Sequence, residues 1–422
     1  MNALWQRMRP LRSRILLLLA VVGPGIITAN VDNDAGGITT YSVAGAHYGY
    51  TLLWMMPLVA LALVIVQEMS ARLGVITGKG LADLIREMLG VRVTALIIGI
   101  LVFVNLANTV SEFAGVAASM EIFGISKFIS VPVAAVGVWL LIVKGNYRTV
   151  ERIFLVASAI YLAYVISGFL ARPAWTEVLQ SVVTPTFHLD TQFVTIFVTI
   201  IGTTIAPWMQ FYQQSSIVDK GLKPAEYKYE VVDVVLGSLF AVLVAAFIMI
   251  ACAATLFQEG TTIVSASDAA VALRPLAGQF ASTLFGLGLL NASLFSAGIL
   301  PLSTAYTVCE AFGWENSISR ELKEAPIFFG IYTALIVLGA LIILLPIPSL
   351  VQAMLISQTM NGVLLPVILV IMLKVINDRR LMGKFANGRI YNIICWVTAV
   401  VLIALAGILI VATFFPNLMV FK

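Results

Sequence analysis

The fold is decided by the polar stretch Asn30-Val31-Asp32-Asn33-Asp34-Ala35-Gly36-Gly37, which lies inside an otherwise apolar segment from residue 15 to residue 45. A continuous helix at membrane depth would leave these carboxylates and amides without partners, so the stretch indicates a break in the helix. A second break is indicated inside the apolar segment 191–217 by the sequence Gly202-Thr203-Thr204-Ile205-Ala206-Pro207. Pro207 lacks a backbone donor, and the adjacent threonines can bond the carbonyls that the break frees. Both segments are therefore expected to form discontinuous helices.

The composition of the chain excludes a soluble domain. Of its 422 residues, 60% are apolar and only 11% are charged, and the mean hydropathy is +1.02, far from the mix found in soluble proteins. Apolar runs of about 20 residues, the length that spans a bilayer, recur along the whole chain. We expect an all-α polytopic membrane protein with a single transmembrane domain over residues 1–422 and eleven transmembrane helices. The predicted spans cover residues 15–45, 50–71, 94–120, 129–146, 152–171, 191–217, 230–257, 277–309, 326–346, 349–375 and 391–415.

The positive charges predict how the chain crosses the membrane. With the N-terminus in the cytoplasm, 21 of the 25 Lys and Arg residues fall in segments on the cytoplasmic side of the predicted spans. Such an excess is typical of the cytoplasmic loops of membrane proteins. We therefore expect a multi-pass protein of the cytoplasmic (plasma) membrane, with its N-terminus in the cytoplasm and its C-terminus outside. The net charge of +4 is small and scattered through short loops, which argues against a nucleic-acid partner.

The two breaks lie in the first and sixth predicted spans. This spacing is expected when spans one to five and spans six to ten form a 5+5 inverted repeat. The first repeat then covers residues 15–171, the second covers residues 191–375, and the span 391–415 is an accessory helix. These features predict a LeuT-type fold, in which discontinuous helices 1 and 6 face each other near the bilayer midplane and form the ion or substrate site.

Carboxylates inside the predicted spans need a partner, because an isolated charge in a membrane helix is costly. Asp34 is the strongest candidate for a metal ligand, since it lies in the first break beside two glycines and no basic residue lies deep in a predicted span to neutralise it. Alternatively, Asp34 caps the helix that follows. Asp32 and Asn33 add oxygen atoms to the same break or bond its freed backbone groups. Glu112 is either a second carboxylate on an ion pathway or a hydrogen bonder between packed helices.

Several motifs resemble those of a known family. The stretch Asp34-Ala35-Gly36-Gly37, between Gly23-Pro24-Gly25 and Ala44-Gly45-Ala46-His47-Tyr48-Gly49-Tyr50-Thr51-Leu52-Leu53-Trp54, resembles the first-helix signature of the NRAMP family of divalent metal transporters. Similar stretches follow at Ser70-Ala71-Arg72-Leu73-Gly74-Val75-Ile76-Thr77-Gly78, Ser111-Glu112-Phe113 and Asp378-Arg379-Arg380-Leu381-Met382-Gly383-Lys384. The resemblance covers most of the chain and implies a secondary transporter of divalent metal ions.

The chain departs from the NRAMP pattern at the metal site. The family motif Asp-Pro-Gly-Asn stands here as Asp34-Ala35-Gly36-Gly37, so the asparagine ligand is lost. The family motif Met-Pro-His stands as Ala206-Pro207-Trp208, which removes a soft thioether that favours manganese or iron over magnesium. Two histidines linked to the family's proton path correspond to Trp208 and Gln213, and an acidic residue corresponds to Thr109. None of these three side chains titrates near neutral pH, which argues against proton coupling.

This pattern is similar to that of the NRAMP-related magnesium transporters, a branch of the family. The resemblance implies uptake of magnesium, and also of manganese, by alternating access and without obligatory proton movement. Gly37 and Ala206 enlarge the site, which suits an ion that gives up its water reluctantly. The metal residues implied by the resemblance are Asp34, Val31, Gly37, Thr203 and Ala206, with the carbonyls of Val31 and Thr203 facing the ion. The resemblance also implies further carboxylates or ligands that act through water, at Asp32, Asn33 and Glu112, of which Asn33 is an amide. It implies that the ion pathway is lined or gated by Thr109, Trp208 and Gln213.

Two other functions stay open. One is a proton-coupled manganese or iron importer of the NRAMP type, with Glu112 as proton acceptor. The other is a membrane sensor that kept the transporter fold and signals to a partner. An enzyme is not expected, because no nucleophile–base pair and no phosphate-binding loop is evident in the sequence. We expect no cofactor and a monomeric chain, whose partners are the transported ion, Mg²⁺ or Mn²⁺, and the lipid bilayer.

Overall fold

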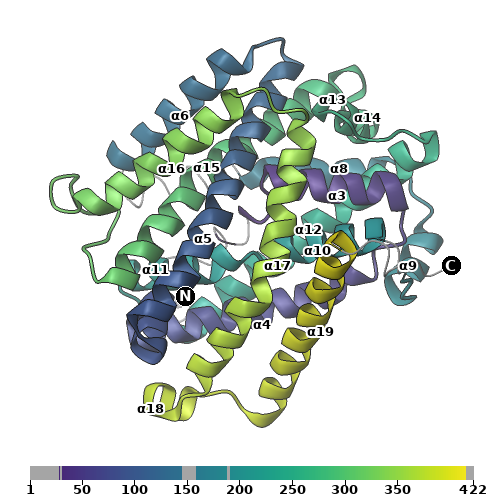
Figure 1. The fold of residues 1–422 in the computed structure, drawn as a ribbon. Coiled ribbons are helices and arrows are strands. Elements are labelled where there is room, and N and C mark those ends of the chain that lie inside the picture. Colours follow the sequence, from purple (N-terminus) through teal and green to yellow (C-terminus); the bar gives the residue numbers. More distant parts are fainter. Residues whose placement is uncertain (1–27, 29–30, 145–157, 188–190, 415–422) are drawn as a thin grey trace, which may run out of the picture.

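The computed structural model describes residue 28 and residues 31–144, 158–187 and 191–414, and the regular elements of this part of the chain are all helical (Figure 1). The longer helices are α3 (Ala35–Tyr48), α4 (Met55–Thr77), α5 (Leu81–Ile122), α6 (Lys127–Lys144), α10 (Thr191–Thr204), α11 (Pro207–Lys220), α12 (Tyr227–Cys252), α15 (Ala281–Phe312), α16 (Pro326–Leu344), α17 (Leu350–Asn377) and α19 (Arg389–Phe414). The shorter elements are η1 (Ser158–Tyr161), α8 (Leu162–Leu170), α9 (Trp175–Val183), η2 (Ala253–Phe257), α13 (Ala266–Ala269), η3 (Ala270–Leu273), α14 (Arg274–Ala277), η4 (Gly278–Phe280), α18 (Arg379–Met382) and η5 (Gly383–Phe385).

Nine helical segments in the described part of the chain are long and apolar enough to cross a membrane. They correspond to the second to fourth and the sixth to eleventh predicted spans. The predicted first and fifth spans, 15–45 and 152–171, lie partly outside the described residues. The total of eleven therefore stays a prediction, whereas the polytopic helical architecture is confirmed.

Both predicted breaks are present. Residue 31 is helical, residues 32–34 form a turn, and α3 begins at Ala35. The second break separates α10, which ends at Thr204, from α11, which begins at Pro207. Ala206 between them has extended backbone geometry, with φ −65° and ψ 139°. Proline is well placed at the start of α11, because the first amide of a helix has no intrahelical partner.

The third span begins earlier than its hydropathy predicts. Its predicted start is residue 94, whereas α5 begins at Leu81 and continues through Gly90, where the backbone leaves helical geometry (φ 79°, ψ 164°). The positive φ at this kink favours glycine. Asp83 and Arg86 make the segment before the kink too polar to be recognised as part of a span. A short amphipathic helix therefore leads into the spanning part of α5.

The two broken helices lie inside the helix packing. Helices α3, α10 and α11 are buried along almost their whole length, as expected for helices with no lipid-facing or solvent-facing side. They pack against α4 and α12 and against α5, α15 and α17. Figure 1 shows α5, α15, α16 and α6 side by side, and α19 at the edge of the molecule, where it contacts α17 and α10. Of the two broken helices, α19 therefore contacts α10, and its role as an accessory helix stays a prediction.

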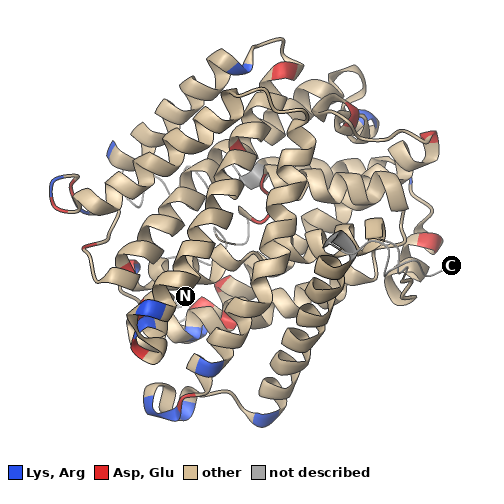
Figure 2. Cartoon of the chain, viewed as in Figure 1, with Lys and Arg blue, Asp and Glu red and all other residues tan. Residues whose placement is uncertain are grey.

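The charged residues gather at the ends of the helices. Figure 2 shows Lys and Arg around the start of α5, at α18 and at the start of α19, with long uncharged stretches of helix between the charged ends. These positions belong to segments that the charge bias assigns to the cytoplasmic side. The orientation of the chain in the membrane stays a prediction.

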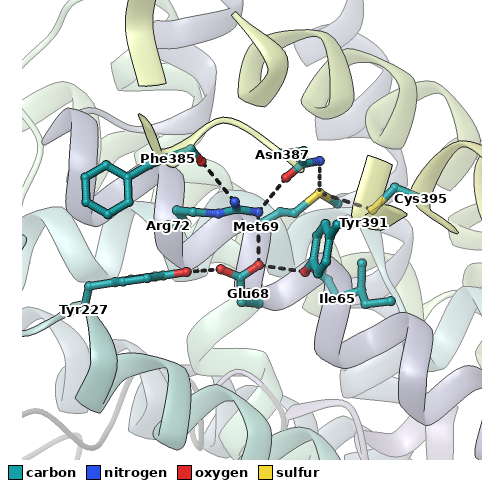
Figure 3. Close-up of polar contacts among 9 residues, drawn as sticks. All are labelled: Ile65, Glu68, Met69, Arg72, Tyr227, Phe385, Asn387, Tyr391 and Cys395. Atoms are coloured by element: carbon teal, nitrogen blue, oxygen red, sulfur yellow. Dashed lines mark hydrogen bonds and ion pairs between the residues drawn. The ribbon is translucent and has the colours of Figure 1, made fainter. Parts of the chain in front are cut away.

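A polar cluster joins α4, α12 and α19 near α18 and the start of α19 (Figure 3). Arg72 and Glu68 of α4 form an ion pair at 3.1 Å, with side chains only 11% and 13% exposed. Arg72 also donates to Asn387 Oδ1 at 2.6 Å, and the Tyr391 hydroxyl of α19 donates to Glu68 Oε2 at 2.7 Å. The Tyr227 hydroxyl donates to the other Glu68 oxygen. Because every charge in the cluster is paired, the cluster fixes the first residue of α12 against α4 and α19.

Candidate metal site

Asp34 occupies the first break and caps α3. Its Oδ1 accepts a hydrogen bond from the amide of Gly37 at 2.5 Å, and the residue is 3% exposed. The predicted capping role is therefore present in the structure. The N-terminus of a helix favours a negative charge, and the donors to the Asp34 carboxylate, the Gly37 amide and the Gln358 side-chain amide, are electrically neutral. The cap leaves the charge of Asp34 available to a cation.

Gln358 of α17 is the main side-chain partner of Asp34, and the sequence did not single it out. Its Nε2 lies 3.3 Å from Asp34 Oδ1 and 3.2 Å from Oδ2. The approach requires glycine at position 36, because a Cβ there would lie 2.0 Å from the Gln358 Nε2 atom. The Gln358 amide nitrogen thus lies within hydrogen-bond distance of both carboxylate oxygens of Asp34.

The orientation of Gln358 is set by two further amides. Asn361, one turn later on α17, donates to Gln358 Oε1 at 2.9 Å. Asn361 and Asn108 of α5 exchange two hydrogen bonds of 2.9 and 3.0 Å. All three amides are buried. The sequence signal on α17 for this chain of contacts is Gln358 and Asn361, two amides three residues apart within a predicted span.

Glu112 of α5 reaches the same helix end. Its Oε2 accepts a hydrogen bond from the amide of Ala35 at 3.3 Å, and its side chain interacts with that of Asp34. The other oxygen, Oε1, is buried without a hydrogen-bond partner. Two carboxyl groups therefore meet at the N-terminus of α3, and Glu112 also makes a hydrogen bond between packed helices.

Asp32 and Asn33 are buried in the turn before α3. The Nδ2 of Asn33 donates to the carbonyl of Ala241 in α12 at 3.3 Å. Asn33 therefore bonds a backbone group, but on a neighbouring helix and not within the break. Neither oxygen of Asp32 has a hydrogen-bond partner, although the residue is only 1% exposed. A buried carboxylate in this state is costly unless a cation or water completes it.

The two breaks meet at Gly37. A Cβ on this residue would lie 2.4 Å from the carbonyl oxygen of Asp32 and 3.1 Å from Thr203 Oγ1 of α10. The hydroxyls of Tyr41 in α3 and Thr204 in α10 are 2.8 Å apart and join the two helices directly. The space that Gly37 was expected to leave open is thus occupied by the Asp32 carbonyl and the Thr203 hydroxyl. Since that hydroxyl is buried without a partner, it adds another oxygen to the site.

Comparison with known sequences decides the family. A family model described as Nramp, Natural resistance-associated macrophage protein-like, matches residues 25–412. This chain belongs to the NRAMP family. A relative in Bacillus subtilis, named divalent metal cation transporter MntH, is 27% identical over 409 residues, which cover 94% of this chain and 93% of the relative. The protein of the same name in Ralstonia nicotianae is 30% identical over 399 residues, covering 90% of this chain and 88% of the relative.

Solved structures confirm the fold. A manganese transporter from Eremococcus coleocola, crystallised with an aromatic bis-isothiourea compound, superimposes with a TM-score of 0.76 at 21% identity and covers 95% of this chain and 88% of its own. Mhp1, a nucleobase-cation-symport-1 family transporter, gives a TM-score of 0.59 at 15% identity, with 94% and 92% covered. NRAMP transporters and Mhp1 share the LeuT-type fold. The predicted family and the predicted fold are both confirmed.

The NRAMP resemblance implies that five further residues lie at or beside this site. In the structure these residues do not all lie near Asp34. Val31 is buried directly before the turn of the first break, and Ala206 is buried in the second break. Thr109 donates to the Asn105 carbonyl of its own helix at 2.9 Å, and its methyl group faces α16 and not Asp34. Trp208 and Gln213 are buried along α11, and Gln213 faces Glu230 of α12. Thr109 and Gln213 therefore lie outside the group that meets at Asp34.

The site offers oxygen atoms almost exclusively. Among the described residues, no three His, Cys, Asp or Glu side chains gather at metal-binding distances. The oxygen groups that meet at the breaks are the carboxylates of Asp34 and Glu112 and the hydroxyl of Thr203, with Asp32 adjacent, while Gln358 presents its Nε2 donor to Asp34. Such a set can hold a hard divalent cation through one or two carboxylates while the cation keeps part of its water.

Proposed function

We propose that this protein carries divalent cations across the cytoplasmic membrane by alternating access, with magnesium as the main ion and manganese as a second substrate. The observation that carries the proposal is Asp34, a buried carboxylate placed where two discontinuous helices meet and hydrogen-bonded by the neutral amides of Gly37 and Gln358. The relatives named as divalent metal cation transporters and the manganese transporter of the same fold support the same class of substrate.

The choice of magnesium rests on the chemistry of the ligands. Asp34 supplies the charge, and the carbonyls of Val31 and Thr203 and the positions of Gly37 and Ala206 complete the metal site in our proposal. Ala206 has no donor atom where a methionine would supply a soft sulfur. Magnesium prefers oxygen ligands and retains several of its waters, which Asp32, Asn33 and Glu112 would bind in the outer shell.

We further propose that transport is not coupled to protons. Thr109, Trp208 and Gln213 carry no group that titrates near neutral pH. The competing proposal, a proton-coupled manganese importer, is favoured by one observation, the contact of Glu112 with Asp34. In that case Glu112 would release or accept the proton while Asp34 binds the ion.

The driving force follows from the proposed orientation. With the N-terminus in the cytoplasm, an inside-negative potential favours entry of a divalent cation by about 4.6 kcal/mol per 100 mV, twice the value for one elementary charge. Uptake down this gradient needs no second ion. We propose one transporter domain over the whole chain, with repeats 15–171 and 191–375 and accessory helix 391–415, acting as a monomer.

Uptake into liposomes tests the proposal. The purified protein is reconstituted with a fluorescent magnesium reporter inside the vesicles. We expect magnesium influx that saturates with concentration, that becomes faster when the interior is made negative, and that external manganese inhibits. Influx no faster than in protein-free liposomes would contradict the proposed function.

A further inference from the structure

An apolar groove lies between α4, α10 and α19 and has a volume of about 330 Å³. Two of its lining residues, Ile201 and Ile205, are almost fully buried, at 7% and 1% exposed. Two others, Leu61 of α4 and Val397 of α19, are 54% and 57% exposed. The groove therefore has a buried floor and an open side. Because all three helices belong to candidate membrane spans, the open side faces the hydrocarbon of the bilayer.

The floor of the groove reaches the second break. Ile205 lies between Thr204, the last residue of α10, and Ala206, which precedes α11. Its amide donates to the carbonyl of Ile201 at 2.9 Å, so the two floor residues lie one turn apart. A molecule in the groove would pack directly against the discontinuous helix that contributes to the metal site.

A basic segment follows α17 and leads into α19. Its exposed basic residues are Lys374, Arg379, Arg380, Lys384 and Arg389, of which several are visible at α18 and at the start of α19 in Figure 2. None of the five forms an ion pair in the described part of the chain. The acidic residue among them, Asp378, caps α18 by accepting a hydrogen bond from the amide of Arg380 at 2.8 Å. The segment therefore carries an excess of positive charge.

The basic segment is held at one end of the groove. The Tyr391 hydroxyl, in the first turn of α19, lies 3.2 Å from the carbonyl oxygen of Ile65, which lines the groove. Arg72 of α4 donates to η5 and to the loop that follows it (Figure 3). Ile394, another lining residue, follows Arg389 by five residues, which corresponds to about 7.5 Å along α19. The positive charges thus lie within the length of a lipid headgroup from the apolar groove.

We propose that this surface binds an anionic phospholipid, with one acyl chain in the groove and the phosphate among the basic residues. A basic cluster directly beside a membrane span attracts anionic headgroups, and an apolar groove open to the bilayer accepts an acyl chain. A soluble anion would leave the groove empty, and a neutral lipid would leave the positive charge unmatched. The acyl chain packs against Ile201 and Ile205 and stabilises the second break. Lipid binding itself does not depend on the proposed transport function.

Native mass spectrometry of the purified full chain tests the site. The protein in detergent is mixed with phosphatidylglycerol or with phosphatidylcholine of the same acyl chains, and the mass shift reports the bound lipid. We expect the unchanged protein to bind phosphatidylglycerol at least about tenfold more tightly than phosphatidylcholine. The quadruple variant Arg379→Gln, Arg380→Gln, Lys384→Gln and Arg389→Gln is expected to lose this preference. The measurement contains no magnesium and no transport step, so its outcome is independent of the proposed function.

A charge-matched variant controls for general attraction to a positive surface. It carries four other substitutions of exposed basic residues, Lys223→Gln, Lys228→Gln, Arg320→Gln and Lys323→Gln. These positions lie outside the basic segment, and the variant is expected to keep the preference for phosphatidylglycerol.

A tryptophan on the open side tests the groove separately. Val397→Trp is expected to lower the affinity for phosphatidylglycerol about tenfold, which corresponds to lost contact with about two methylene groups. The control is Val337→Trp on α16, because Val337 is also an exposed apolar residue of a candidate span but does not line this groove. This control is expected to bind with unchanged affinity.

Four results would overturn the inference. Equal affinity of the unchanged protein for the two lipids would exclude an anionic headgroup site, and an equal loss of preference in the two glutamine variants would show only general charge attraction. Equal affinity of the two tryptophan variants would show that no acyl chain enters the groove. If glycerol 3-phosphate displaces phosphatidylglycerol at equal concentration, the basic residues bind a soluble phosphate and not a lipid.

Discussion

Asp34→Asn is expected to abolish magnesium transport while the protein still folds. Asparagine caps helices as well as aspartate does, so the hydrogen bond to the amide of Gly37 is kept. The variant loses only the negative charge, which the cation needs in this buried site. We expect the rate of magnesium influx into liposomes to fall at least about 100-fold, since even the loss of an outer-shell partner of a metal ligand costs about 10–100-fold.

The control for this variant is Asp268→Asn. Asp268 also caps a helix, in a reciprocal arrangement with Ser265 at the start of α13, but it is only partly buried and lies outside the metal site. We expect Asp268→Asn to transport at the unchanged rate. If Asp34→Asn also transports at the unchanged rate, then Asp34 is only a helix cap and the metal site has been misassigned.

Ala206→Met is expected to shift the ion preference from magnesium toward manganese. Ala206 lies at the junction of α10 and α11, and methionine adds a soft thioether beside the oxygen ligands. We expect manganese to compete with magnesium influx about tenfold more effectively in the variant, a change of about 1.4 kcal/mol in relative affinity. The measurement is the manganese concentration that halves magnesium influx into liposomes.

A leucine variant separates the effect of sulfur from the effect of size. Ala206→Leu fills a similar volume without a donor atom, so it is expected to slow the transport of both ions without changing their ratio. An unchanged ratio in both variants would show that position 206 does not face the ion.

The broken helices could be predicted because their cause is local. A run of polar residues before Ala35 and a proline at residue 207 exclude a continuous membrane helix whatever surrounds them. The kinked start of α5 could not be predicted from hydropathy, since the segment from Leu81 to Gly90 is amphipathic and buries its apolar side against neighbouring helices. Its boundary depends on tertiary packing, which a sliding count of apolar residues does not capture.

The site was predictable only where a single residue is unusual in its own span. Asp34 and Glu112 are rare carboxylates in apolar helices, and the structure brings them together. Gln358 was missed because it follows Asp34 by more than 300 residues, and only helix packing shows that α17 faces the first break. Thr109 was expected near the ion pathway, but its place on α5 turns it toward α16. Polarity along one helix does not show which neighbour that side of the helix contacts.

Uncoupled magnesium transport is tested most directly by following magnesium and protons in liposomes made from one preparation of the protein. One set of vesicles contains the magnesium reporter and a parallel set contains a pH-sensitive dye. We expect saturable magnesium influx while the pH dye stays silent, because Trp208, Gln213 and Thr109 offer no titrating group. Influx of manganese alone, accompanied by acidification of the vesicle interior, would contradict it and would make Glu112 the proton carrier of a manganese importer.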